Sequence, residues 1–325
     1  VVADDFDIRR VAEVVDVLGR NEHHELLSQG ARAFSRHLIK GHHFSFSVIN
    51  NPVVGVELRR TIVAAALAIA CAAAAFAQRR FDDFGFGGYR GRVPEIRNIP
   101  YDGRFTFVRV KYDTAPGGYW AGGRPAWVHG FPLAEQNLMR IMTDMSYLNP
   151  HVEEINVLTL DDPELFKYPV AYIIEVGWWT VNDREAAALR AYIQKGGFVI
   201  VDDFKVLGWR GIDTGGWDPF AETMNRVFPG VRFFDMDASH PIFHSFFELN
   251  EQKLDDVPQA YNSGRPVFRG VYEDNDPAKR LVMIINYNTD VSQFWEWSGR
   301  GLRPVDDTNE AYKLGVNYLM YGVTH

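Results

Sequence analysis

The stretch that most constrains the fold of this chain is residues 182–203, NDREAAALRAYIQKGGFVIVDD. Asn182 can cap a helix, and Glu185 can reach back to the free amides of its first turn. Apolar residues then recur at spacings of three and four, which predicts an amphipathic helix, and Gly196-Gly197 predicts its end. The unbroken apolar run from Phe198 to Val201 is typical of a strand that helices cover on both faces.

The rest of the downstream sequence repeats this alternation of helical and strand patterns. Such alternation predicts an α/β fold with a doubly wound, mainly parallel sheet. We also expect an antiparallel hairpin from residues 267–272 and 281–287, followed by a last helix over residues 309–321. The other predicted strands are 105–112, 155–160, 170–176 and 232–237, and the other predicted helices are 133–148 and 218–228.

An export signal lies well inside the chain rather than at its start. Residues 57–77 combine a basic Arg59-Arg60 pair, an apolar stretch and an Ala-x-Ala cleavage site, the pattern of a secretory signal peptide. A membrane anchor is the alternative, although the apolar run is short for a bilayer. The expected location is therefore the periplasm or another exported compartment. We interpret residues 1–56 as an upstream extension or disordered head, residues 78–103 as an extended arm, and residues 104–325 as one α/β domain.

Composition excludes several classes of function. A formal net charge of −8 gives no basic footprint for nucleic acid. The one cysteine, Cys71, lies in the predicted signal peptide, so the domain has no thiol for a nucleophile or metal cluster. The glycine motif at residues 85–88 does not join a strand to a helix, so it is not a phosphate-binding loop. The sequence also has no GxxxxGK[ST] motif, which argues against an NTPase. Neither a cofactor nor a metal is expected, and membrane contact is expected only through an uncleaved leader.

Candidate catalytic residues come from the ends of the predicted strands. In open parallel sheets, ligands bind at the carboxyl edge. Glu175, Asp203 and His240 each follow or end a predicted strand, so we expect them at one shared edge. Structural roles are the alternative for each residue: a hydrogen bond for Glu175, support of the next loop for the aspartate, and a packed imidazole beside Pro241 for His240.

Candidate ligand-binding residues lie in the same strand ends and in two long loops rich in glycine and tryptophan. Indole rings at a sheet edge can stack on sugars or peptides, although packing within a lid explains them equally well. Adjacent strand residues face opposite ways, so only one member of the Asp202-Asp203 pair is expected to reach a ligand. The full set of candidates is Asp113, Trp120, Arg124, Trp178, Asp202 and Trp209.

Five segments together resemble the family called domain of unknown function 4159, over residues 104–323: FTFVRVKY, FPLAEQNLMRIM, LDDPELFKYPVAYIIEVGWW, LRAYIQKGGFVIVDDF and ASHPIFHSFF. The resemblance implies an exported or membrane-attached bacterial protein with a flavodoxin-like, class I glutamine amidotransferase-like fold. An amidotransferase needs a cysteine on the turn after the third strand. Here that turn is Glu175-Val176-Gly177-Trp178, so glutaminase activity is expected to be absent.

Two functions stay open at this point. The first is a non-catalytic module that binds a protein or carbohydrate ligand of the cell envelope at the tryptophan-rich edge. The alternative is a hydrolase-like enzyme acting on a carbohydrate or related envelope substrate, with Glu175, an aspartate of the 202–203 pair and His240 as acid–base groups or metal ligands. The enzyme requires these side chains to converge within hydrogen-bond reach, whereas the module would use them for backbone contacts.

Overall fold

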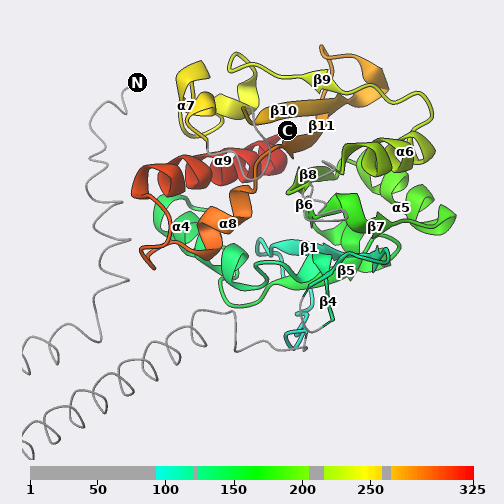
Figure 1. The fold of residues 1–325 in the computed structure, drawn as a ribbon, viewed down its shortest axis with the longest axis horizontal. Helices are drawn as coiled ribbons and strands as arrows, with labels where there is room; N and C mark the ends of the chain where they lie inside the picture. The colour runs from blue at the N-terminus through cyan, green and yellow to red at the C-terminus, as the bar shows by residue number, and fades with distance from the viewer. Residues whose placement is uncertain (1–92, 121–122, 205–215, 258–264) are drawn as a thin grey trace, which may run out of the picture. The chain divides into compact units, whose positions relative to one another are not determined.

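The computed structural model describes residues 93–120, 123–204, 216–257 and 265–325, which belong to one compact unit, Gly91–His325 (Figure 1). The predicted upstream extension, the signal peptide, most of the arm and Trp209 lie outside the described residues. Within the described ranges, no helix is both long and apolar enough to cross a membrane.

A seven-stranded sheet, most of it parallel, forms the centre of the unit and confirms the predicted α/β class. The strand order is β5-β1-β6-β8-β11-β10-β9. The first five strands in this order run parallel, whereas β10 is antiparallel to β11 and β9 is antiparallel to β10. The strands are β1 (Val108–Lys111), β5 (Asn156–Thr159), β6 (Val170–Ile174), β8 (Phe198–Asp202), β9 (Phe234–Asp235), β10 (Val267–Tyr272) and β11 (Leu281–Tyr287).

Helices cover both faces of the sheet, as the continuous apolar strands require. Two helices, α5 (Asp183–Gln194) and α6 (Trp217–Val227), pack together on one face. Three others pack together on the opposite face: α4 (Leu133–Met145), α8 (Val291–Glu296) and α9 (Val305–Thr324) (Figure 1). A short helix, α7 (Glu251–Asp255), lies between β9 and β10 in the chain.

Helix α5 begins and ends where the sequence predicts. Asn182 accepts a hydrogen bond from the Glu185 amide at 3.0 Å, and Glu185 accepts one from the Asn182 amide at 2.9 Å. Gly196 follows the helix with φ of +105°, a value that glycine adopts at little cost. A Cβ atom on Gly197 would lie 2.3 Å from the Tyr192 ring, so only glycine lets β8 begin this close to the helix.

Other boundaries differ from the predictions for local reasons. Helix α6 begins at Trp217 rather than after an Asp218 cap, because Gly216 takes a left-handed conformation at its N-cap. The strand predicted at 232–237 shortens to β9, since it pairs only with β10 at the sheet edge. The predicted hairpin is confirmed as β10 and β11, but β11 also pairs in parallel with β8 and so joins the main sheet.

Candidate functional site

Two acidic residues follow neighbouring parallel strands at the carboxyl edge of the sheet. Glu175 comes directly after β6, and Asp203 comes directly after β8. Both have left-handed backbone conformations, with φ of +54° and +52°, and both are buried. The Tyr112 hydroxyl lies 2.9 Å from the carbonyl oxygens of Ile174 and Glu175, which fixes the turn after β6.

The two carboxyl groups meet at one imidazole. His129 Nδ1 lies 3.1 Å from Oε1 of Glu175 and 3.3 Å from Oδ2 of Asp203. The His129 side chain is 23% exposed, whereas the Glu175 and Asp203 side chains are 1% and 2% exposed. The imidazole is therefore the solvent-facing part of a buried acidic cluster.

His129 follows a short 3-10 helix, η3 (Ala126–Val128), which a buried ion pair holds in place. Arg109 of β1 donates from Nη1 to the carbonyl oxygens of Trp127 and His129 at 3.2 and 3.3 Å. Its Nε donates to Oε1 of Glu135 in α4 at 2.6 Å, and both side chains are fully buried. Breaking a buried pair of this kind is costly, so it fixes the backbone of the histidine firmly.

The carboxyl groups around the imidazole favour its charged form. Burial alone would lower the pKa of His129, but hydrogen bonds to Asp203 and Glu175 and the charge of Asp290 outweigh burial and raise the pKa well above its usual value. Burial raises the pKa of Glu175, and hydrogen bonds with His129 and Asp203 oppose that rise.

Asp290, at the N-cap of α8, is the third acid close to His129. It accepts hydrogen bonds from the Ser292 hydroxyl and the Gln293 amide, both at 3.0 Å and both on Oδ1. Burial and the charge of Asp203 raise the pKa of Asp290 to about 7. His129, Asp203 and Asp290 each offer one ligand atom, and these three atoms lie within 4.8 Å of one another.

Asp202, the other member of the predicted acidic pair, has a structural position. Its Oδ2 accepts hydrogen bonds from the Tyr172 hydroxyl and the Ser292 amide at 2.9 and 3.0 Å. Its Oδ1 accepts from the Asn286 side chain and the Val291 amide at 3.1 and 3.3 Å. Asp202 therefore joins β8 to β11 and α8 inside the core, and burial raises its pKa to about 7. As the alternation of strand side chains predicts, only one member of the pair reaches the cluster.

The predicted ligand-binding residues occupy different positions around this edge. The Trp120 ring lies 4.9 Å from the His129 ring and is 37% exposed. Trp178 packs against the closely approaching backbone of Gly118, where a Cβ atom would lie 2.6 Å from the tryptophan Cβ. Asp113 is exposed at the start of β2 (Asp113–Thr114), which pairs with β7 (Trp179–Thr180), and Arg124 is half-buried in β4 (Arg124–Pro125).

His240 does not join the cluster, which corrects the expectation of one shared edge for all three catalytic candidates. Its Nδ1 accepts a hydrogen bond from the Ile242 amide at 3.1 Å and caps η7 (Pro241–His244). Its ring lies 6.0 Å from that of Tyr321, which in turn packs on Phe198 at the first residue of β8. His240 therefore lies at the amino edge of the sheet, and burial lowers its pKa.

Sequence reasoning did not select His129 or Asp290 as site residues. His129 carried a weak signal, because it lies in a long glycine-rich loop that starts after a predicted strand, where function is common. Asp290 carried a weaker one, because the residues before it were predicted as a hairpin strand. Only the parallel pairing of β11 with β8 brings Asp290 to the same edge as Asp203.

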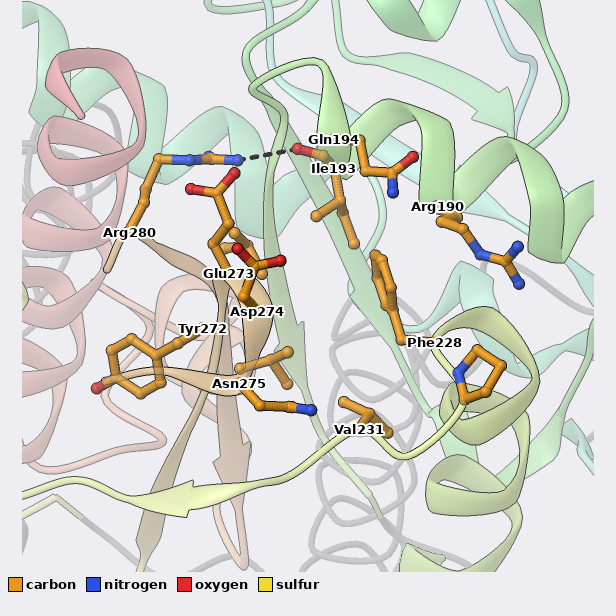
Figure 2. Close-up of a pocket in the computed structure, with 13 residues that line it drawn as sticks. Arg190, Ile193, Gln194, Phe228, Val231, Tyr272, Glu273, Asp274, Asn275 and Arg280 are labelled. Carbon is orange, nitrogen blue, oxygen red and sulfur yellow. Dashed lines mark hydrogen bonds between the residues drawn. The ribbon is translucent and has the colours of Figure 1, made fainter. Parts of the chain in front are cut away.

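A pocket of about 350 Å³ lies at the opposite, amino edge of the sheet (Figure 2). Arg280 and Arg190 line it, but their guanidinium groups already donate to backbone carbonyl oxygens of Ile193 and Val227. Asp274 at its rim pairs with Lys279. Because its charged groups mostly serve nearby backbone and surface contacts, the pocket is the weaker candidate site. Its other lining residues are Gln194, Phe228, Pro229, Val231, Val271, Tyr272, Glu273, Asn275 and Val282.

Fold and site together define a mainly parallel α/β protein with a buried histidine–carboxylate cluster at the carboxyl edge of its sheet. Residues 106–323 match the family described as domain of unknown function (DUF4159), and the chain belongs to this family. The predicted family is thereby confirmed over nearly the same residues. A comparison with curated proteins gives no match.

Proposed function

We propose that this protein is a hydrolase-like enzyme whose catalytic groups are Glu175, Asp203 and His129. One observation carries the proposal. Glu175 and Asp203 follow two neighbouring strands, both have a left-handed backbone conformation, and both side chains contact the same imidazole. A non-catalytic module would leave these groups to serve backbone contacts, as Asp202 does. His129 takes the place that sequence reasoning gave to His240.

Backbone strain supports a functional role for this turn. Left-handed conformations are uncommon outside glycine, and a bulky residue such as glutamate tolerates them less well than asparagine or aspartate. Each such residue costs about 1–3 kcal/mol and persists where the surroundings impose it, most often at functional sites. Glu175 takes this strained conformation directly after β6, and the conformation brings its carboxyl group to His129.

The position of the cluster in the sheet also supports the proposal. The chain runs from β1 outward to β5 and then returns to β6 on the other side of β1, so strand order reverses between β1 and β6. Ligands of open α/β sheets bind beyond the carboxyl ends at such a reversal. Numbered along the chain, the five parallel strands lie in the order 2-1-3-4-5. This order supports the proposal of a flavodoxin-like, amidotransferase-like architecture, which the family resemblance implies.

Two carboxyl groups that meet at one imidazole suit hydrolysis by acid–base catalysis. The ionised member of the Glu175–Asp203 pair takes a proton from water, and the resulting hydroxide forms a bond to the electrophilic carbon of the substrate. The bond from that carbon to the leaving group breaks with its electron pair. The protonated carboxyl group or the His129 imidazolium then donates a proton to the leaving group, so one water is consumed per bond cleaved.

A carbohydrate is the substrate class that the surroundings favour. Trp120 presents a partly exposed indole next to His129, and indole faces pack well on the apolar faces of sugar rings. We further infer that the protein works in the cell envelope, which rests on the signal-peptide pattern of residues 57–77.

Hydrolysis of a panel of envelope and storage glycans by the full chain tests this function. We expect Glu175→Gln and Asp203→Asn to lower kcat by about 100-fold or more with little change in KM, the usual loss on removing an acid–base group. Glu248→Gln is the matched control, because Glu248 also contacts a histidine but is exposed on the surface. Turnover unchanged in both site variants would contradict the proposal. Glycan binding without turnover, abolished by Trp120→Ala, would establish the binding module instead.

A further inference from the structure

We propose that His129, Asp203 and Asp290 together bind one divalent transition-metal cation, with Glu175 left beside it as the acid–base group. With the cation bound, His129 and Asp203 are deprotonated ligands, and Glu175 alone transfers protons. The cation's role in catalysis rests on the proposed function, whereas the binding itself does not. No sequence motif indicates this site, because its three ligands come from the loop before α4, the end of β8 and the N-cap of α8.

The spacing of the three side chains fits a common ion. Their candidate ligand atoms lie within 4.8 Å of one another. Nitrogen and oxygen ligands at about 2.0–2.5 Å from one ion cannot lie more than about 5 Å apart, so all three reach a single centre with small side-chain adjustments. Asp203 and Asp290 are 1% and 2% exposed, unlike the surface acids that gather without binding an ion.

Asp290 is held in place beside His129 and Asp203. Its Oδ1 accepts hydrogen bonds from the Ser292 hydroxyl and the Gln293 amide, both at 3.0 Å. The Ser292 hydroxyl and Gln293 amide hold the carboxylate in one orientation, as outer-shell partners of metal ligands commonly do.

The balance of charge also favours a cation. Three buried carboxyl groups, those of Glu175, Asp203 and Asp290, gather near one imidazole, so even a charged imidazole leaves more acidic than basic groups in the cluster. Arg109 contacts the His129 carbonyl, but its charge is paired with Glu135. Buried negative charge requires neutralisation by protons or by a cation.

The ligand set indicates the class of metal. One imidazole nitrogen and two carboxylate oxygens suit Zn²⁺ or Mn²⁺, whereas Mg²⁺ and Ca²⁺ prefer oxygen ligands alone. A metal-bound water at this site would lie close to Glu175, whose Oε1 is 3.1 Å from the proposed histidine ligand. That arrangement supplies both the hydroxide and the base that hydrolysis requires.

Calorimetric titration of the chelator-treated full chain with ZnCl₂ and MnCl₂ tests the site. We expect one equivalent to bind, and we expect His129→Gln and Asp290→Asn each to weaken binding by about 100-fold or more. His151→Gln is the matched control, since His151 also contacts two carboxylates, Asp102 and Glu154, but these acids are exposed. Binding that is absent, or equally strong in both site variants, would overturn the proposal.

Imidazole NMR signals provide a second measurement that needs no variant. The chain has ten histidines, and addition of Zn²⁺ to the wild-type protein should shift one imidazole resonance first, that of His129. Saturation of another histidine instead would contradict the site. If the protein binds the cation tightly but hydrolyses none of the glycans, the cation site stands and the proposed enzymatic function is wrong. If hydrolysis continues after chelation, the cation has no role in catalysis.

Discussion

Asp202 and Asp203 are neighbours in the chain, but the first has a structural role in the core and the second lies in the candidate site. Asp202 is the last residue of β8 and points into the core, where it accepts four hydrogen bonds. Asp203 follows the strand, turns left-handed and contacts His129. Alternation along a strand separates the two side chains, and the end of the strand frees the second one to reach the edge.

Asp202→Asn is expected to lower the free energy of unfolding by about 2–4 kcal/mol, measured by urea denaturation. Each Asp202 oxygen accepts two hydrogen bonds, so an amide NH₂ in place of one oxygen would face two donors and leave buried groups unpaired. Asp113→Asn, an exposed change at the same edge, should alter stability by less than about 0.5 kcal/mol. Equal stabilities of the two variants would contradict the structural role of Asp202.

At the scale of elements, the strand ends determine where the acidic side chains lie, and the helices fix those strands. Helix α5 connects β6 to β8 and therefore sets the positions of both Glu175 and Asp203. Its capping box and its glycine stop are local features, which is why the sequence predicts both of its ends. By contrast, β9 and the start of α6 depend on sheet pairing and on the conformation of Gly216.

Loss of the α5 cap should weaken the fold without changing the cluster directly. We expect Asn182→Ala to lower the free energy of unfolding by about 1 kcal/mol, because the side-chain oxygen that accepts from the Glu185 amide is removed. Asn182→Asp keeps an acceptor and should retain most of that stability. Thermal unfolding of the three proteins measures the difference, and an alanine variant as stable as the wild type would show that the cap contributes nothing.

At the scale of the molecule, the buried cluster makes stability depend on pH. The pKa of His129 is raised above its unfolded value, so its stabilising contribution is present at low pH and is lost as pH rises through the folded value. The pKa values of Asp202 and Asp290 are raised to about 7, so ionising them costs more in the folded state. These two aspartates therefore also reduce stability as pH rises. The loss begins near pH 4, roughly their pKa in the unfolded chain, and is complete above about pH 7, their pKa in the folded protein.

The melting temperature of the chelator-treated protein should therefore fall between about pH 5 and pH 8, by roughly 5 °C. Asp290→Asn should flatten this dependence, because asparagine still caps α8 but cannot ionise. A melting temperature that rises over the same interval would contradict the charge distribution of the cluster. Restoring a bound divalent cation should reverse the trend, since its ligands must be deprotonated.

The sequence by itself determined the α/β class, the ends of α5, the β10–β11 hairpin, the family and the positions of Glu175 and Asp203 after their strands. These features depend on local periodicity, capping residues and glycines, which act over a few residues. Tertiary structure alone decided that His129 meets the two acids, that β11 inserts beside β8 and brings Asp290 to them, and that His240 lies at the other edge. Strand order and pairing join segments far apart in the chain, and no local pattern encodes which loop reaches which strand end.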